Sequence, residues 1–98
     1  MKNKNIKYIL KDSLNTHISM HDTHDEVMKI LTELNTKIFK NDTWSIFGGT
    51  FDDLPCLEDN ALFRIPKDIR ENYSDNKFIN FYFFKFDLNT NKRLDLYK

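Results

Sequence analysis

The residues with the clearest chemical potential are three histidines within eight positions, His17, His21 and His24, accompanied by Asp22, Asp25 and Glu26. Imidazoles and carboxylates are common ligands of zinc and related metals. The spacing matches no zinc signature, and on a strand His17 and His21 would lie roughly 13 Å apart, too far to share one ion. A helix would place them on one face, so a metal site requires a helix here. The other interpretation is solvated histidines near a helix start, and we predict no bound metal.

The single cysteine, Cys56, is the only candidate thiol nucleophile. Covalent catalysis needs a base and a third group that orients it, and the sequence around Cys56 indicates neither. Its acidic surroundings are expected to raise the thiol pKa and so to lower its reactivity. One cysteine also excludes an intrachain disulfide and is typical of a reducing compartment.

Two pairs of acids lie in a long predicted loop over residues 50–60: Asp52 and Asp53, then Glu58 and Asp59. Paired carboxylates can perform acid–base or metal chemistry. The loop lacks the pattern of an EF-hand, however, and Gly48-Gly49 lacks the Lys and Ser/Thr of a phosphate-binding loop. We therefore expect no cofactor and no catalytic residue. The two glycines instead indicate a bulge, a turn or a close approach of backbone.

An aromatic stretch over residues 78–86, FINFYFFKF, predicts the central strand. Seven of its nine residues are aromatic or aliphatic, a composition that fits a pleated surface better than a helix. Side chains alternate between the faces of a strand, and one face would carry Phe78, Tyr82, Phe84 and Phe86, the other Ile79, Phe81 and Phe83. A strand that is apolar on both faces must be covered on both. One helix can cover one face, so the other needs a loop, a second copy of the chain or a different protein.

Residues 24–40 are predicted to form the main helix. Thr23 and Glu26 have the spacing of a capping box at its start. The apolar residues that follow fall on one helical stripe: Val27, Ile30, Leu31, Leu34 and Ile38. This stripe is expected to cover one face of the sheet.

Two hairpins flank these elements. Residues 5–12 are predicted to pair with 16–21, although one irregular helix over 5–19 is an alternative. The aromatic strand is predicted to turn at Asn89–Asn91, where Asn supplies a positive φ, and to pair with 93–97.

Shorter elements complete the predicted fold. Strands are expected at 43–47 and 61–65, and one helical turn is expected near 68–71. The order β-β-α-β-β-β-β predicts an α+β fold: a small antiparallel sheet with one main amphipathic helix packed on one face. The length predicts a single domain over residues 1–98.

Charge limits the classes of partner. The 15 basic and 15 acidic residues cancel, which weighs against a wholly basic nucleic-acid surface. The charge is uneven, however, at +3 over residues 1–20, −6 over 21–60 and +3 over 61–98. The N-terminal residues lack the apolar segment of a signal peptide, and no apolar run is long enough to span a bilayer, so we expect a cytoplasmic protein.

These features favour a small non-enzymatic protein-binding module, of the inhibitor or immunity type. Heavy use of Asn and Lys indicates an AT-rich genome, which suits a phage- or mobile-element-encoded protein that blocks a host or defence enzyme. The predicted partner-binding residues are Asp52, Asp53, Glu58, Asp59, Tyr82 and Phe84. A homodimer through the aromatic strand is compatible with this interpretation.

The alternative is a nucleic-acid-binding accessory protein that uses its basic N- and C-terminal regions, including Lys2, Lys4, Lys7, Arg64, Lys67 and Arg70. Residues 77–84 also have the aromatic character of the RNP1 strand of RNA-recognition modules. Phe78 and Asn80 stand where that strand carries small residues, and the second helix of that fold is missing.

Overall fold

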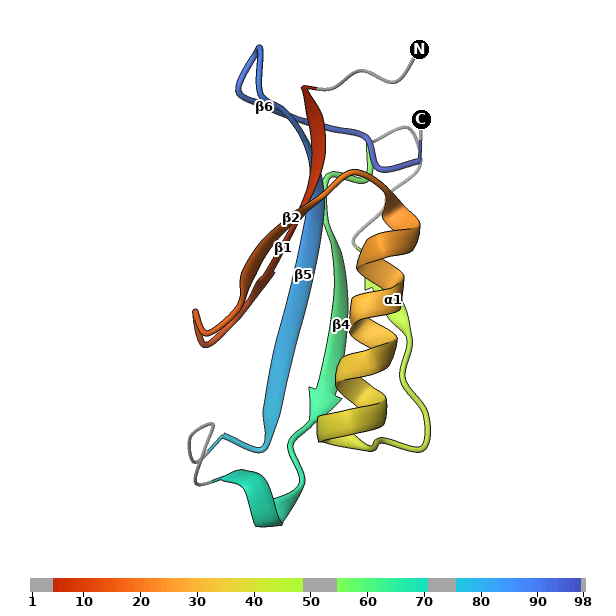
Figure 1. Ribbon diagram of the computed structural model, residues 1–98, viewed down its shortest axis with the longest axis vertical. Helices are drawn as coiled ribbons and strands as arrows, with labels where there is room; N and C mark the ends of the chain where they lie inside the picture. The colour runs from red at the N-terminus through yellow and green to blue at the C-terminus, as the bar shows by residue number, and fades with distance from the viewer. Residues whose placement is uncertain (1–4, 49–54, 71–75, 98) are drawn as a thin grey trace.

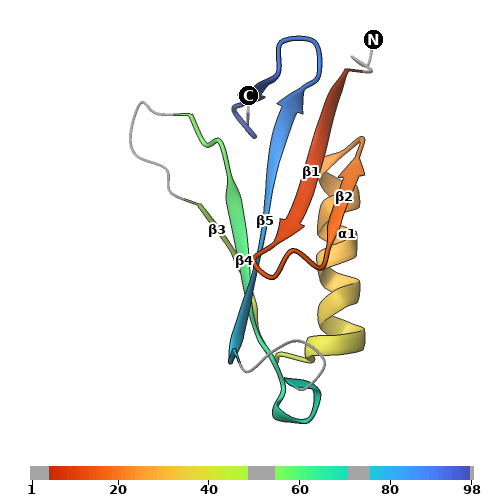
Figure 2. The same ribbon diagram turned by 90° about the vertical axis from the view of Figure 1, so that its left-hand side faces the viewer.

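A computed structural model describes residues 5–48, 55–70 and 76–97. Within these residues six strands form one antiparallel sheet: β1 (Ile6–Asp12), β2 (Ile18–His21), β3 (Ile46–Gly48), β4 (Asp59–Arg64), β5 (Phe78–Asp87) and β6 (Lys92–Leu94). β6 pairs with the end of β5 (Figure 1), and the spatial order of the other strands is β2-β1-β5-β4-β3 (Figure 2). Together with one main helix on one face, this arrangement confirms the predicted α+β class.

The aromatic strand β5 is the centre of the sheet, as predicted. Its second half pairs with β1, from Phe81 opposite Asp12 to Asp87 opposite Ile6. Its first half pairs with β4. The predicted hairpin with β6 is also confirmed, although β6 ends at Leu94, three residues before the predicted end. Asn91 in its turn has a φ of 57°. The Asn side chain tolerates this left-handed conformation, which explains how the turn closes without glycine.

The first hairpin is confirmed as strands, not as the alternative helix. β1 and β2 pair from Tyr8 opposite His21 to Lys11 opposite Ile18. The turn between them is held by Asp12, which is buried and accepts hydrogen bonds from the Thr16 backbone N–H (2.8 Å) and from its hydroxyl.

The predicted helix over 24–40 is confirmed, although its last turn is wider than a regular helix. It comprises α1 (His24–Leu34) and a π-helical turn, η1 (Asn35–Phe39), and it ends at Lys40 with a φ of 53°. Thr23 Oγ1 accepts from the Glu26 N–H at 3.2 Å, as a capping box requires. The Glu26 carboxylate accepts a hydrogen bond from the Asp22 N–H (3.0 Å). In a standard capping box it would accept from the N–H of the N-cap residue itself, Thr23.

The helix covers one face of the sheet and leaves the other face bare in the described residues. We call them the covered face and the open face. Figure 2 shows the open face toward the viewer, with α1 behind it. The core lies on the covered face, where Ile79, Phe81 and Phe83 of β5 are 0–2% exposed. They pack with residues of the neighbouring elements: Leu10, Val27, Leu31, Phe39, Ala61 and Phe63.

The predicted boundaries of strands β3 and β4 are wrong. The strand expected at 43–47 begins only at Ile46, because the Asn41 amide bonds the N–H and C=O of Arg64 (both 2.9 Å) and so occupies the groups that Thr43 would have used. The strand expected at 61–65 begins two residues earlier, at Asp59. The expected turn near 68–71 is the 3₁₀ helix η2 (Lys67–Ile69). Within the described ranges, no helix is both long and apolar enough to cross a membrane.

Candidate functional site

The three histidines do not converge on one point. His17 Nε2 and His21 Nε2 lie 2.8 and 2.7 Å from Ser19 Oγ, so both imidazoles share one hydroxyl on β2. His24 instead lies among the rings of Tyr8, Phe83 and Tyr97. No group of three or more His, Cys, Asp or Glu side chains that could hold a metal ion occurs among the described residues.

Ser19, His21 and Glu26 have the residue types of a hydrolytic triad, which the sequence did not suggest. The hydroxyl-to-imidazole distance of 2.7 Å suits general-base activation. A triad also needs the acid to hold the imidazole by a hydrogen bond. Here Glu26 Oε2 is 3.9 Å from His21 Nδ1 and accepts instead from the Asp22 N–H. The arrangement therefore ties β2 to the start of α1 and does not orient a catalytic base.

The buried residues Cys56 and Asp59 form a polar cluster with Tyr97, which is itself 60% exposed. Cys56 Sγ lies 3.2 Å from Asp59 Oδ1, and the Tyr97 hydroxyl donates to Asp59 Oδ2. Burial, followed by the hydrogen bond and the charge of Asp59, raises the pKa of the Cys56 thiol. The predicted rise in pKa is confirmed, with burial as its largest cause. A protonated thiol that donates to a carboxylate is a poor nucleophile, so this cluster is structural.

Gly48 makes room for this cluster. It lies directly opposite Asp59 in the sheet, and a Cβ added there would overlap Asp59 Oδ1 and come within 3.1 Å of the Glu58 carbonyl. The predicted close approach at the glycines is confirmed for Gly48, whereas Gly49 lies outside the described residues. The C-terminal segment closes the other side, where the Leu96 N–H donates to the Cys56 carbonyl at 2.9 Å.

The predicted acidic contact patch is not formed by its described members. Asp59 is only 3% exposed and points into the covered face, so its expected surface position is wrong. Glu58 points the other way and accepts from Arg93 Nη1 at 3.3 Å. Neighbouring residues of a strand face opposite sides, which is why the two acids separate. Asp52 and Asp53 lie outside the described residues.

Tyr82 and Phe84 both lie on the open face, but they differ in accessibility. Tyr82 is half-buried, between Lys11 on β1 and Asn60 on β4. Phe84 is only 7% exposed, because the Arg93 guanidinium lies 3.9 Å from its ring centroid and Phe86 packs against its edge. Partner binding by either residue stays a prediction, and Phe84 would be reached only if Arg93 moved.

The open face carries most of the exposed apolar surface. Eight large hydrophobic side chains are exposed in the described part of the chain, and five of them occupy strand positions on this face: Ile18, Met20, Phe47, Leu62 and Phe78. Each is between 44% and 66% exposed. Sequence reasoning named none of the five as a binding residue. The alternation along each short strand was the signal that could have found them.

The register of the sheet places these residues in rows across the strands. One row runs Ile18, Lys11, Tyr82, Asn60 and Phe47, from β2 to β3. The neighbouring row on the same face, two residues away along each strand, contains Met20, Ile9 and Phe84. Side chains directly opposite one another have Cβ atoms about 5 Å apart, so each row is continuous. The exposed apolar residues therefore form two groups: Phe47, Leu62 and Phe78 are diagonal neighbours on β3, β4 and β5, and Ile18 and Met20 lie on β2. Lys11, Tyr82 and Asn60 lie between the two groups.

A shallow hollow extends the open face at its β3 edge. It has a volume of about 360 Å³ and is lined by Phe47 and Leu62, together with Thr43, Trp44 and Ser45. A hollow with aromatic and aliphatic walls is the kind of site in which a partner's apolar side chain is buried.

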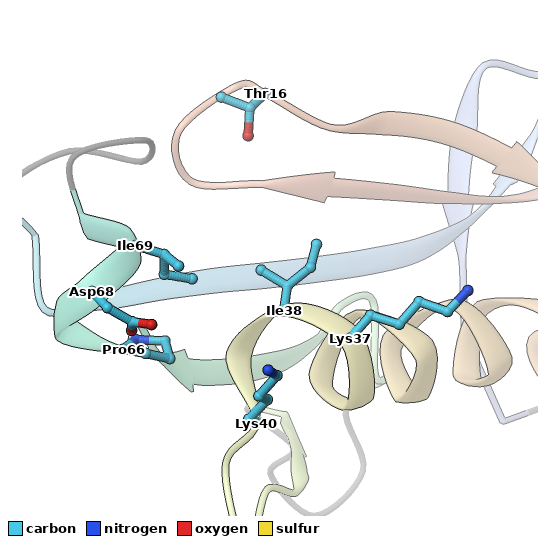
Figure 3. Close-up of a pocket in the computed structure, with 7 residues that line it drawn as sticks. All are labelled: Thr16, Lys37, Ile38, Lys40, Pro66, Asp68 and Ile69. Atoms are coloured by element: carbon cyan, nitrogen blue, oxygen red, sulfur yellow. The ribbon is translucent and has the colours of Figure 1, made fainter.

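A larger cavity, of about 530 Å³, lies between the end of the helix, η2 and the turn of the first hairpin (Figure 3). Ile38 and Ile69 face one another across it. The Lys37 side chain runs back along the helix, away from Asp68, so the charged groups do not converge on a point inside the cavity. A ligand site needs convergent polar groups, and this cavity lacks them among the residues drawn.

Comparison with models of known protein families, with curated proteins and with solved structures found no match to this chain.

Proposed function

We propose that the protein is a non-enzymatic binding module that docks on another protein through the open face of its sheet. The observation that carries this proposal is that five of the eight exposed large hydrophobic side chains in the described residues lie on one face. Apolar side chains scattered singly over a surface need no explanation, whereas a contiguous patch marks an interaction site.

The polar clusters support a non-catalytic role. The Cys56 thiol is buried and donates to Asp59. Ser19 is hydrogen-bonded to His17 and His21, and the acid nearest His21, Glu26, is 3.9 Å away and out of hydrogen-bonding reach. In both places the hydrogen bonds join elements of the fold. Neither arrangement presents an activated group beside a cavity, which is where substrate chemistry occurs.

An inhibitor or immunity-type activity fits the construction of the open face. Its apolar residues lie on hydrogen-bonded strands, so their backbone is already ordered before binding. The conformational entropy that is lost on binding is therefore small. Aromatic residues and Met, such as Phe47, Phe78 and Met20, are enriched at the centres of protein interfaces. A rigid sheet of this kind can block a surface of an enzyme without itself changing shape.

A second candidate, binding of single-stranded nucleic acid, has one specific observation in its favour. Arg64 lies directly opposite Phe78, and Lys11 lies directly opposite Tyr82. Surfaces that bind single strands combine cations for the phosphates with aromatic rings for the bases.

The test of the proposed function compares two substitutions of the same type. Leu62→Asp places a charge on the open face, and Leu57→Asp is its control, because Leu57 is 41% exposed and Leu62 is 44% exposed. Biotinylated wild type and both variants are used to capture proteins from the native host, and bound proteins are quantified by mass spectrometry. We expect a protein that is retained by wild type and Leu57→Asp and reduced at least tenfold by Leu62→Asp. Equal retention by all three would contradict the proposal.

A further inference from the structure

The charges on the open face indicate the chemistry of its partner. We propose that the open face binds an acidic, apolar segment of another protein, with carboxylates that pair with Lys11 and Arg64; this inference rests on the proposed function.

Basic residues outnumber acids on the open face of the described sheet. Strand positions there carry Lys7, Lys11, Arg64 and Arg93. Two acids pair with them, Asp22 with Lys7 and Glu58 with Arg93. Asp42 lines a hollow together with Arg64, but no ion pair joins these two residues. Two cations, Lys11 and Arg64, thus have no acid partner among the described residues. An apolar surface with an excess of positive charge is complementary to an apolar surface with acids.

The positions of the two cations set a requirement on the partner. Lys11 is on β1 and Arg64 is on β4, with β5 between them. From the register, they are roughly 10 Å apart across the strands and roughly 13 Å apart along them. One carboxylate cannot meet both, so the partner must present at least two acids. The apolar residues between the cations include Tyr82 and Leu62, which would contact the apolar part of the same segment.

A second copy of the chain is disfavoured as the occupant. Two open faces brought together would set the same excess of positive charge against itself, and like charges across an interface reduce affinity. The acids of each open face are already paired with Lys7 and Arg93, so they could neutralise the other copy only by giving up these bonds.

Single-stranded nucleic acid is disfavoured by the apolar side chains themselves. Ile18, Met20 and Leu62 have no aromatic face on which a base could stack. The Phe84 ring, at the centre of the sheet, is covered by the Arg93 guanidinium. An amphipathic protein segment can use the aliphatic side chains and the hollow at Phe47, whereas a nucleic acid leaves both unfilled.

The test uses a display library of random 15-residue peptides, panned on immobilised wild type and counter-selected on Leu62→Asp. Affinities of the enriched peptides are measured with three proteins: wild type, the Lys11→Glu/Arg64→Glu variant, and a control Lys29→Glu/Lys67→Glu variant, which reverses two exposed lysines that lie outside the open face. Circular dichroism checks that each variant folds, and Lys11→Gln/Arg64→Gln replaces the charge-reversal variant if that variant does not fold.

We expect the enriched peptides to carry at least two acids among apolar residues. Their affinity should fall at least tenfold with the open-face reversal and less than twofold with the control.

The other outcomes would contradict the inference, the proposed function or both. Enriched peptides without acids, or an unchanged affinity for the open-face reversal, would overturn the inference and leave the proposed function standing. No peptide that distinguishes wild type from Leu62→Asp would contradict the proposed function as well. A 15-nucleotide oligo(dT) that binds wild type more tightly than the peptides and is released by the reversal would assign the face to nucleic acid. A dimer in sedimentation velocity that Leu62→Asp dissociates would assign it to a second copy.

Discussion

The two faces of the central strand carry similar side chains but have different surroundings. Phe81 and Phe83 point into the covered face and are almost completely buried beneath the helix. Phe78, on the open face, is half exposed, and Phe84 is shielded only by the side chains of Arg93 and Phe86. The comparison shows that aromatic composition alone does not define a core. What lies over each face decides whether the same residue type stabilises the fold or presents a surface.

The difference between the faces has an electrostatic counterpart. On the covered face, Asp12 and Asp59 are buried, and each accepts two hydrogen bonds from side chains or backbone nearby. On the open face, Lys11 and Arg64 are not matched by acids among the described residues. The covered face therefore satisfies both carboxylates internally, although His24 Nε2 is buried there without a hydrogen-bond partner.

The largest expected difference in stability is between the alanine variants of Phe83 and Phe78. Phe83→Ala removes a completely buried ring and should lower the free energy of unfolding by about 3–5 kcal/mol. Phe78→Ala, at a half-exposed position, should lower it by less than about 1 kcal/mol. Urea denaturation followed by circular dichroism measures both. Similar losses for the two variants would mean that the open face is covered too.

Gly48→Ala tests the packing of the covered face at its edge. The added methyl group would overlap the Asp59 carboxylate, so we expect a loss of about 1–3 kcal/mol. In an Asp59→Ala background the same substitution should cost much less, because the atom it overlaps is gone. If the cost is the same in both backgrounds, Asp59 is not what Gly48 accommodates.

The buried thiol predicts a dependence of stability on pH. Because the fold raises the pKa of Cys56, the protonated thiol stabilises the folded state below the ordinary thiol pKa of about 8.5. Above that pH the unfolded chain ionises first, and stability falls by up to about 1.4 kcal/mol per pH unit. Cys56→Ala should flatten the decline in unfolding free energy between pH 8.5 and pH 10. If the unfolding free energy declines with the same slope in wild type and in Cys56→Ala, the decline is due to other groups. One such group is Tyr97, whose pKa is also raised by burial and by Asp59.

The smallest expected effect on stability is at Leu62. Leu62→Asp should stay within about 0.5 kcal/mol of wild type, because this residue is already 44% exposed to solvent. Thermal unfolding at pH 7 provides the measurement, with Leu31→Asp as the contrasting substitution in the core. A loss at Leu62 that approaches the loss at Leu31 would indicate that this part of the open face is packed against the rest of the chain.

Local patterns were sufficient to predict the elements that depend on local interactions. The cap at Thr23, the apolar stripe that follows it and the alternation of residues 78–86 each specify their element within a few neighbouring positions. The boundary of β3 could not be predicted in this way. It depends on the Asn41 side chain, which bonds the backbone of Arg64, 23 residues away.

The candidate site was less predictable than the fold. Glu58 and Asp59 are adjacent acids, and their separation into a surface ion pair and a buried cluster depends on Arg93, Gly48 and Tyr97, all distant in sequence. The open-face residues lie on separate short strands, and only the sheet order β2-β1-β5-β4-β3 brings them together. Strand alternation divides the side chains of a strand into two sets, but it does not say which set the helix will cover.

Hydroxyl-radical footprinting of the free protein, and of its complex with the captured partner, would show whether the open face is the binding surface. We expect Met20 and Phe78 to be readily oxidised in the free protein and protected by the partner, and Phe81 and Phe83 to resist oxidation in both. Protection of Met20 and Phe78 in the free protein, or their unchanged oxidation in the complex, would contradict the claim that the open face is the binding surface.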